Sequence, residues 1–187
     1  DLGSQLVLGS QRALGKDSRP LAINGGSLVA RGAWRTISNP VTVGADFFLG
    51  LITVNNQMNL SGTVNLGGTT RTISVVDNAV AQDSIFSGVV SNGGLIKVGA
   101  GTLVLSAANT YTGSTTVNEG TLFLNNSSSL ASSSPITVNG SGARLIGGNA
   151  GVIPGAVTLT QGGVDLSGSI PSLTVADLAE NTVGTGN

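Results

Sequence analysis

The chain has 187 residues and a net charge of −1, and only 9% of its residues are charged, against roughly 25% in an average soluble domain. It contains no histidine and no cysteine, which excludes imidazole bases, thiol nucleophiles, disulfides and zinc sites built from these ligands. Because 40% of the residues are hydrophobic and the net charge is low, the composition predicts a folded chain.

The chain begins with Asp1-Leu2-Gly3, which does not resemble the start of a signal peptide. Its apolar runs are far shorter than the roughly 20 residues that a membrane-spanning helix needs. We therefore expect no membrane span within this segment, and we expect any secretion signal or anchor to lie outside it.

Short runs of Val, Leu, Ile and Thr that alternate with polar residues follow one another along the whole chain. In chain order they are QLVL, LAIN, SLVA, VTV, LITV, NLSGTVNL, RTISV, LIKV, TLVL, TLFL, ITV, RLIG, VTL, VDL and LTV. Gly, Asn or Ser bounds each run, a pattern typical of strands joined by turns. Helical periodicity is absent from every long window, so we predict one all-β segment over residues 1–187.

The turns recur at a nearly fixed spacing. Residues 116–118, 137–139 and 158–160 share one tripeptide shape at intervals of 21 residues, and residues 97–103 map onto 116–122 at an interval of 19. Such a period predicts a single parallel β-helix with about 20 residues per coil and about nine coils. An antiparallel sandwich or jelly roll is the rival, but its loops vary in length and would not keep one residue type at the turn.

Five residues mark the corners of these coils. Asn118 and Asn139 occupy equivalent turns, where Asn tolerates a left-handed backbone and can form an amide ladder with an Asn stacked above it. Gly120, Gly140 and Gly162 are expected to relieve crowding at one corner of successive coils.

One segment resembles a known family. Residues 93–122 read GGLIKVGAGTLVLSAANTYTGSTTVNEGTL, with Lys97 in the opening motif, GAGTLVL as a strand, NTYTG as a turn and TTVNEGTL as the close. This stretch resembles the autotransporter-associated β-strand repeat, also called the passenger-associated transport repeat, and residues 35–44 and 60–75 resemble its usual flanks more weakly. The resemblance implies a right-handed parallel β-helix in the secreted part of a bacterial surface protein, and hence an extracellular or cell-surface location.

The carboxylates do not form a catalytic pattern. Their aspartates are scattered and include no Asp-x-Asp pair, so we predict no enzyme; they are Asp46, Asp77, Asp83, Asp165 and Asp177, interpreted as isolated turn and surface acids. Residues 162–166 lack the third glycine of a calcium-binding nonapeptide, and residues 99–101 precede a strand rather than the helix of a dinucleotide site. We therefore predict no metal and no cofactor.

Aromatic residues are few, and two of them are candidates for glycan contact. Surface rings often stack on sugars, which singles out Trp34 and Tyr111, although Tyr111 also belongs to the turn of the family repeat. Phe86 and Phe123 lie within strand alternation and are expected in the core. The basic residues near the N-terminus do not continue along the chain, so we predict no nucleic-acid binding; they are Arg12, Lys16, Arg19, Arg31 and Arg35.

These observations favour a non-catalytic structural shaft or spacer of a bacterial secreted or cell-surface protein, which extends or presents an adhesive module. One alternative is an extracellular fibre subunit that stacks head to tail through unpaired end coils, because no amphipathic cap is evident; residues 175–180 would form at most one or two helical turns. Residues 1–35 carry five basic and two acidic groups, whereas residues 165–187 carry Asp165, Asp177 and Glu180 and no basic group. A glycan-binding adhesin is the further alternative.

Overall fold

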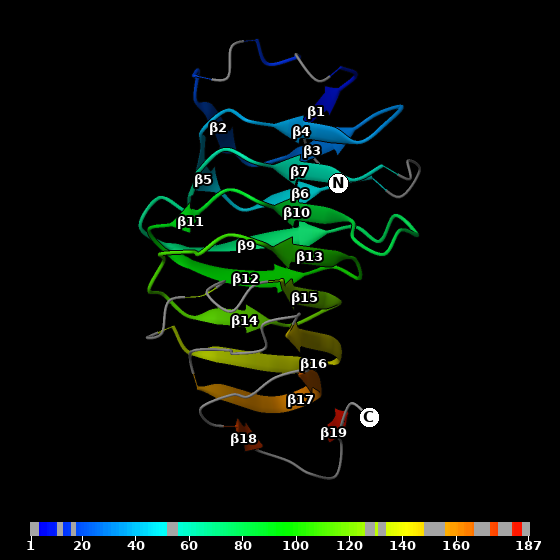
Figure 1. Cartoon of the computed structure of the whole chain (residues 1–187), viewed down its shortest axis with the longest axis vertical. Helices are drawn as coiled ribbons and strands as arrows, with labels where there is room; N and C mark the ends of the chain where they lie inside the picture. Colours follow the sequence, from blue (N-terminus) through cyan, green and yellow to red (C-terminus); the bar gives the residue numbers. More distant parts are fainter. Residues whose placement is uncertain are drawn as a thin grey trace.

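A computed structural model of the chain describes residues 4–10, 13–15, 18–51, 56–125, 130, 134–147, 156–166, 173–175 and 181–184. All regular structure in these residues is β-strand, and the strands stack into an elongated parallel β-solenoid (Figure 1). The all-β solenoid class predicted from the sequence is therefore confirmed. No helix in the described part of the chain is long and apolar enough to cross a membrane.

The strands form three faces, and every pairing between them is parallel. The first face stacks β1 (Gln5–Leu8), β3 (Ser27–Ala30), β6 (Phe47–Leu49), β9 (Thr70–Val75), β12 (Gly94–Val98), β14 (Thr115–Val117), the first part of β16 (Ile136–Gly147), the first part of β17 (Val157–Leu166) and β18 (Leu173–Val175). The second face stacks β4 (Arg35–Ile37), β7 (Met58–Leu60), β10 (Ser84–Phe86), β13 (Thr102–Leu105), β15 (Thr121–Leu124), the second parts of β16 and β17, and β19 (Asn181–Gly184). The third face stacks β2 (Leu21–Asn24), β5 (Val41–Ala45), β8 (Val64–Asn65) and β11 (Val90–Ser91).

The number of coils is lower than the sequence predicted. Six coils run from β2 to the end of β16, with β1 before them and β17, β18 and β19 after them, so the solenoid has about six turns rather than nine. The uniform period of about 20 residues was wrong in the middle of the chain. Paired residues on successive coils are 19 positions apart at Ser84 and Leu103 but 26 apart at Met58 and Ser84, because the connecting loops differ in length.

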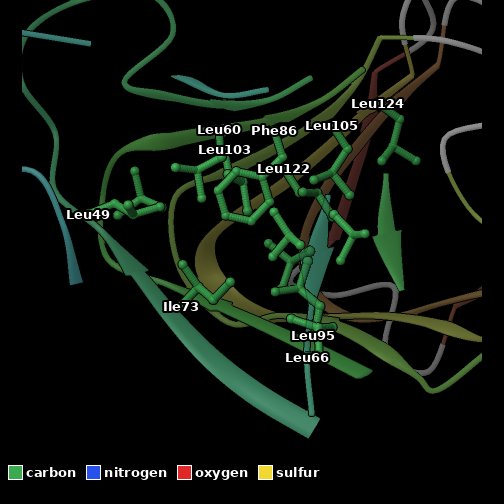
Figure 2. Packing of buried hydrophobic residues seen from close by; sticks show 14 of the residues in the cluster. Leu49, Leu60, Leu66, Ile73, Phe86, Leu95, Leu103, Leu105, Leu122 and Leu124 are labelled. Atoms are coloured by element: carbon green, nitrogen blue, oxygen red, sulfur yellow. The ribbon is translucent and has the colours of Figure 1, made fainter. Parts of the chain in front are cut away.

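The core is built from columns of side chains that stack in register from coil to coil. One column on the second face consists of Ile37, Leu60, Phe86, Leu105 and Leu124, all of them buried. Figure 2 shows the last four of these packed against leucines and Ile73 from the opposite side of the solenoid. Each such side chain contributes roughly 1.5–3 kcal/mol when fully buried, so adjacent coils stabilise one another through the columns.

Three expectations about individual segments need comment. Phe86 is buried as expected, but Phe123 is only half-buried, because Leu122 and Leu124 on either side of it take the inward positions. Residues 52–55 of the predicted strand LITV and residues 176–180 of the C-terminal segment lie outside the described residues. Arg12, Lys16, Asp177 and Glu180 also lie outside them.

Candidate functional site

Three glycines lie where one coil passes closest to the next. Gly120 has a φ of 59°, and a Cβ there would collide with the carbonyl oxygen of Gly99 on the preceding coil. A Cβ at Gly140 would collide with the carbonyl oxygen of Asn118, and one at Gly162 with that of Ala143. Any side chain at these positions would therefore separate the coils.

The two predicted corner asparagines behave differently from the expectation. Neither Asn118 nor Asn139 is among the described residues with a positive φ, and Asn139 lies inside β16, opposite Gln161. The left-handed backbone predicted for them is therefore wrong, because Gly120 takes the positive φ at this corner. An amide contact of the predicted kind occurs elsewhere: Asn92, with a φ of 58°, donates from Nδ2 to Oδ1 of Asn65 at 3.1 Å.

The two candidate glycan-contact rings have opposite environments. Trp34 is 64% exposed in the loop before β4, near the N-terminal end of the solenoid. Tyr111 is 0% exposed, and a ring in the core cannot stack on a sugar, so the structure removes Tyr111 from the candidates. Trp34 stays a predicted contact that its exposure permits.

The segment that resembles the family repeat carries a cluster of polar side chains in the core. On the first face, Lys97 occupies an inward column between Ile73 below and Val117 above, and its side chain is fully buried. Sequence reasoning assigned Lys97 no role, because in LIKV the apolar Ile96 and Val98 would be placed inward. The signal that could have found it is Leu95, which shares a face of the strand with Lys97 and is also buried.

Lys97 holds two coils together through backbone carbonyl groups. Its Nζ donates to the carbonyl oxygens of Val98 at 3.0 Å, Gly99 at 2.7 Å and Glu119 at 3.1 Å, which uses all three of its donors. The Glu119 carboxylate in turn accepts from the Gly99 N–H at 2.8 Å. Burial lowers the pKa of Lys97 to about 8, and the negative charges of Glu119 and Asp83 oppose this shift.

Tyr111 and its neighbours form the second part of this cluster. The Tyr111 hydroxyl lies 2.8 Å from Oγ1 of Thr115, a residue that is itself fully buried. The Tyr111 carbonyl oxygen accepts from the Ser134 hydroxyl at 2.9 Å, and Asn109 Oδ1 accepts from the Val90 N–H at 2.7 Å. Burial strongly raises the pKa of Tyr111. The NTYTG turn thus bonds to the coils on both sides of it.

The described carboxylates act mainly as acceptors for backbone amides. Asp83, interpreted from sequence as a surface or turn acid, is buried, and its two oxygens accept from the N–H groups of Asn78 at 2.6 Å and Thr102 at 2.7 Å. Asp46 accepts from the Thr72 N–H, Asp77 accepts from the Ala79 N–H, and Asp165 lies 4.0 Å from Arg144. The described residues include no group of three His, Cys, Asp or Glu side chains that could hold a metal.

This arrangement fastens coil to coil, since its buried donors and acceptors are paired with the backbone of neighbouring coils. It presents no pair of facing carboxylates among the described residues and no nucleophile held beside a base. What the cluster can do chemically is to fix the spacing and rotation of successive coils.

Comparisons with known proteins agree with the position of this cluster. The profile of the passenger-associated-transport-repeat family matches residues 95–122, which include Lys97, Tyr111 and Thr115. The chain is 36% identical over 138 residues to the adhesin BmaC autotransporter of Brucella suis biovar 1 (strain 1330). This alignment covers 72% of the chain but 4% of that much longer relative. No solved structure matches the chain.

Proposed function

The chain is an autotransporter-associated repeat protein, and from this premise we propose that it forms a stiff, non-catalytic shaft within an exported surface adhesin. The shaft would hold an adhesive module in a fixed orientation at the bacterial surface. Similarity to an autotransporter adhesin supports both the surface location and the link to adhesion.

The observation that carries the proposal is the clamped core of the repeat. Lys97 alone joins the backbone of its own corner to that of the next coil, and Tyr111, Thr115 and Ser134 continue the bonding upward. Paired polar groups in a low-dielectric core have strongly preferred geometries. Coils locked in this way resist rotation and shear, which is the property a shaft needs.

The non-catalytic part of the proposal rests on how the carboxylates are used. Asp83 is buried with both oxygens bonded to amides, so it is not available to donate a proton to a substrate. Asp46 and Asp77 also accept from the backbone. A glycosidase needs two facing carboxyl groups about 5–9.5 Å apart at one sugar ring, and these acids belong to separate coils and turns.

Stiffness can be measured directly because the chain contains no cysteine. Spin labels would be attached at Ser61→Cys and Ser141→Cys, two exposed positions four coils apart. Pulsed electron paramagnetic resonance should give one narrow distance distribution centred near 20 Å plus the label length, since coils stack about 4.8 Å apart. A broad distribution would contradict the shaft.

A second assay tests the absence of catalysis. The purified chain would be incubated with bacterial and plant polysaccharides, and reducing ends would be counted. We expect no release above a boiled control. Hydrolysis that disappears in one Asp→Asn variant with an unchanged circular dichroism spectrum would overturn the non-catalytic reading.

A further inference from the structure

The N-terminal end of the solenoid exposes side chains that are buried everywhere else in their columns. Leu6 of β1 pairs in register with Leu28, which pairs with Leu49, which pairs with Val75. The exposed fractions along this column are 40%, 2%, 0% and 0%. Leu6 points inward like the others, so its exposure arises because no described coil covers it.

The large exposed hydrophobic side chains of the described residues all lie at this end. They are Leu6, Val7 and Trp34, with 40%, 42% and 64% exposure. Leu6 and Val7 belong to β1, whose one pairing within the described residues is with β3. The remaining backbone edge of β1 therefore faces away from the solenoid, and we call this edge together with Leu6, Val7 and Trp34 the N-terminal end surface.

Trp34 is held beside β1 by a rigid backbone contact. The Arg35 guanidinium donates to the carbonyl oxygens of Leu8 at 3.1 Å, Gly9 at 2.7 Å and Arg31 at 2.7 Å. It also donates to the Trp34 carbonyl oxygen at 3.3 Å. The loop that carries the indole is thus fixed to the end of β1, and a preorganised aromatic ring is a typical anchor of a protein interface.

A hollow of about 180 Å³ adjoins the same edge. It is lined by parts of three strands, namely residues 4–6 beside β1, residues 21–25 of β2 and its turn, and Ser27 and Leu28 of β3. The hollow gives the end surface a shape that a further strand and its side chains could fill.

The opposite end offers matching backbone. β18 and β19 each pair with β17 alone among the described strands, on the first and second faces respectively (Figure 1). β18 has the same face and the same parallel direction as β1, and the two strands have three and four residues. The sequence adds opposite charge, with five basic and two acidic groups in residues 1–35 and three acidic and no basic groups in residues 165–187.

We propose that the N-terminal end surface binds the C-terminal end of a second copy of this chain, by parallel addition of β18 to the free edge of β1. Such a contact continues the first face across the junction and covers Leu6 as Leu28 is covered by β1. Trp34 and Val7 anchor the outer side of the junction. Copies of the chain therefore stack head to tail, a property that goes beyond the shaft function and does not depend on it.

The test is the association state of the whole chain across a concentration series. Sedimentation velocity should show a mass that rises with concentration, and negative-stain electron microscopy should show rods lengthened by whole copies. Val7→Lys places a charge on the edge strand and should abolish association, as should Trp34→Ala in larger part than any salt change. Both side chains are exposed, so the circular dichroism spectrum and monomer melting should stay unchanged.

The matched control is Ile96→Lys, which adds the same charge at a half-buried outward position in the middle of the shaft. It should associate like the unmodified chain. A chain that stays monomeric at all concentrations overturns the proposal, and so do side-by-side clusters or equal loss in the control. A glycan array provides the last arm: if Trp34→Ala abolishes sugar binding while association is unchanged, this surface is a glycan site and the proposal is wrong.

Discussion

The coil of the family repeat and the N-terminal end are made from the same type of strand, yet they solve opposite problems. In the repeat, Lys97 and Tyr111 place polar atoms in the core, and neighbouring coils supply their partners. At the N-terminal end, Leu6 and Val7 present apolar side chains that no described coil covers. The difference shows that each coil depends on its neighbours for burial and for hydrogen bonds.

The two aromatic residues in these regions give the largest expected contrast. Tyr111→Ala removes a fully buried ring and its hydroxyl contact, and should lower the free energy of unfolding by about 3–5 kcal/mol. Trp34→Ala should change it by less than about 0.5 kcal/mol, because most of the indole is in water. Urea denaturation followed by circular dichroism measures both. Similar losses would break the comparison.

Leucines of one column extend the comparison to the apolar core. Leu49→Ala, in the middle of the column, should cost about 3 kcal/mol, because it leaves a cavity between two buried neighbours. Leu6→Ala, at the open end, should cost less than about 1 kcal/mol. Denaturant titration at a concentration where the chain is monomeric separates the two. If Leu6→Ala were the costlier change, the end would have to be covered.

Alkaline pH should act on the repeat rather than on the end. Lys97 has a folded pKa of about 8, below the model value of 10.5, so between these values the unfolded chain binds more protons than the folded chain. The free energy of unfolding should therefore rise with pH through this window, by about 2 kcal/mol at pH 10. Above about pH 10 it should fall, because burial raises the pKa of Tyr111 and only the unfolded chain loses that proton readily.

Urea titrations between pH 7 and 11 measure this profile. Lys97→Met is the control: it should lose the rise near pH 8 and keep the fall above pH 10. A flat profile in the unmodified chain would mean that Lys97 is solvated in the folded state.

The smallest expected effect sharpens the role of one hydrogen bond. Tyr111→Phe keeps the ring but leaves the buried Thr115 hydroxyl without its partner, and should cost about 1 kcal/mol. Adding Thr115→Val to the same chain should recover part of that loss, since both polar atoms are then gone. A double-mutant cycle by denaturant titration measures the coupling. Full additivity would contradict a direct bond.

The sequence was a good guide to the class of fold, because a solenoid repeats its strand and turn pattern in the chain. Its coil number was overestimated, since the 26-residue step between Met58 and Ser84 depends on loops without a strand pattern. Strand β10, with Phe86, was missed for the same reason: the run SIF is too short to stand out. Local alternation also misled, because it placed Phe123 inward and gave no reason to place Lys97 in the core.

The polar cluster could be predicted only in part. The repeat motif identified the segment that contains Lys97 and Tyr111, but not that three carbonyl oxygens would converge on one ammonium group. That convergence requires the backbone of two coils, and it depends on register across 22 positions, from Lys97 to Glu119. The exposure of Trp34 is equally a consequence of position along the stack, which composition cannot show.

Amide hydrogen exchange, resolved by residue with nuclear magnetic resonance, tests most directly the claim that each coil is held by its neighbours. In the monomeric chain, amides of β12, β13 and β14 should exchange most slowly, and protection should decline toward β1, whose outer edge is unpaired in the monomer. Slower exchange in β1 than in β12 of the monomer would contradict the account.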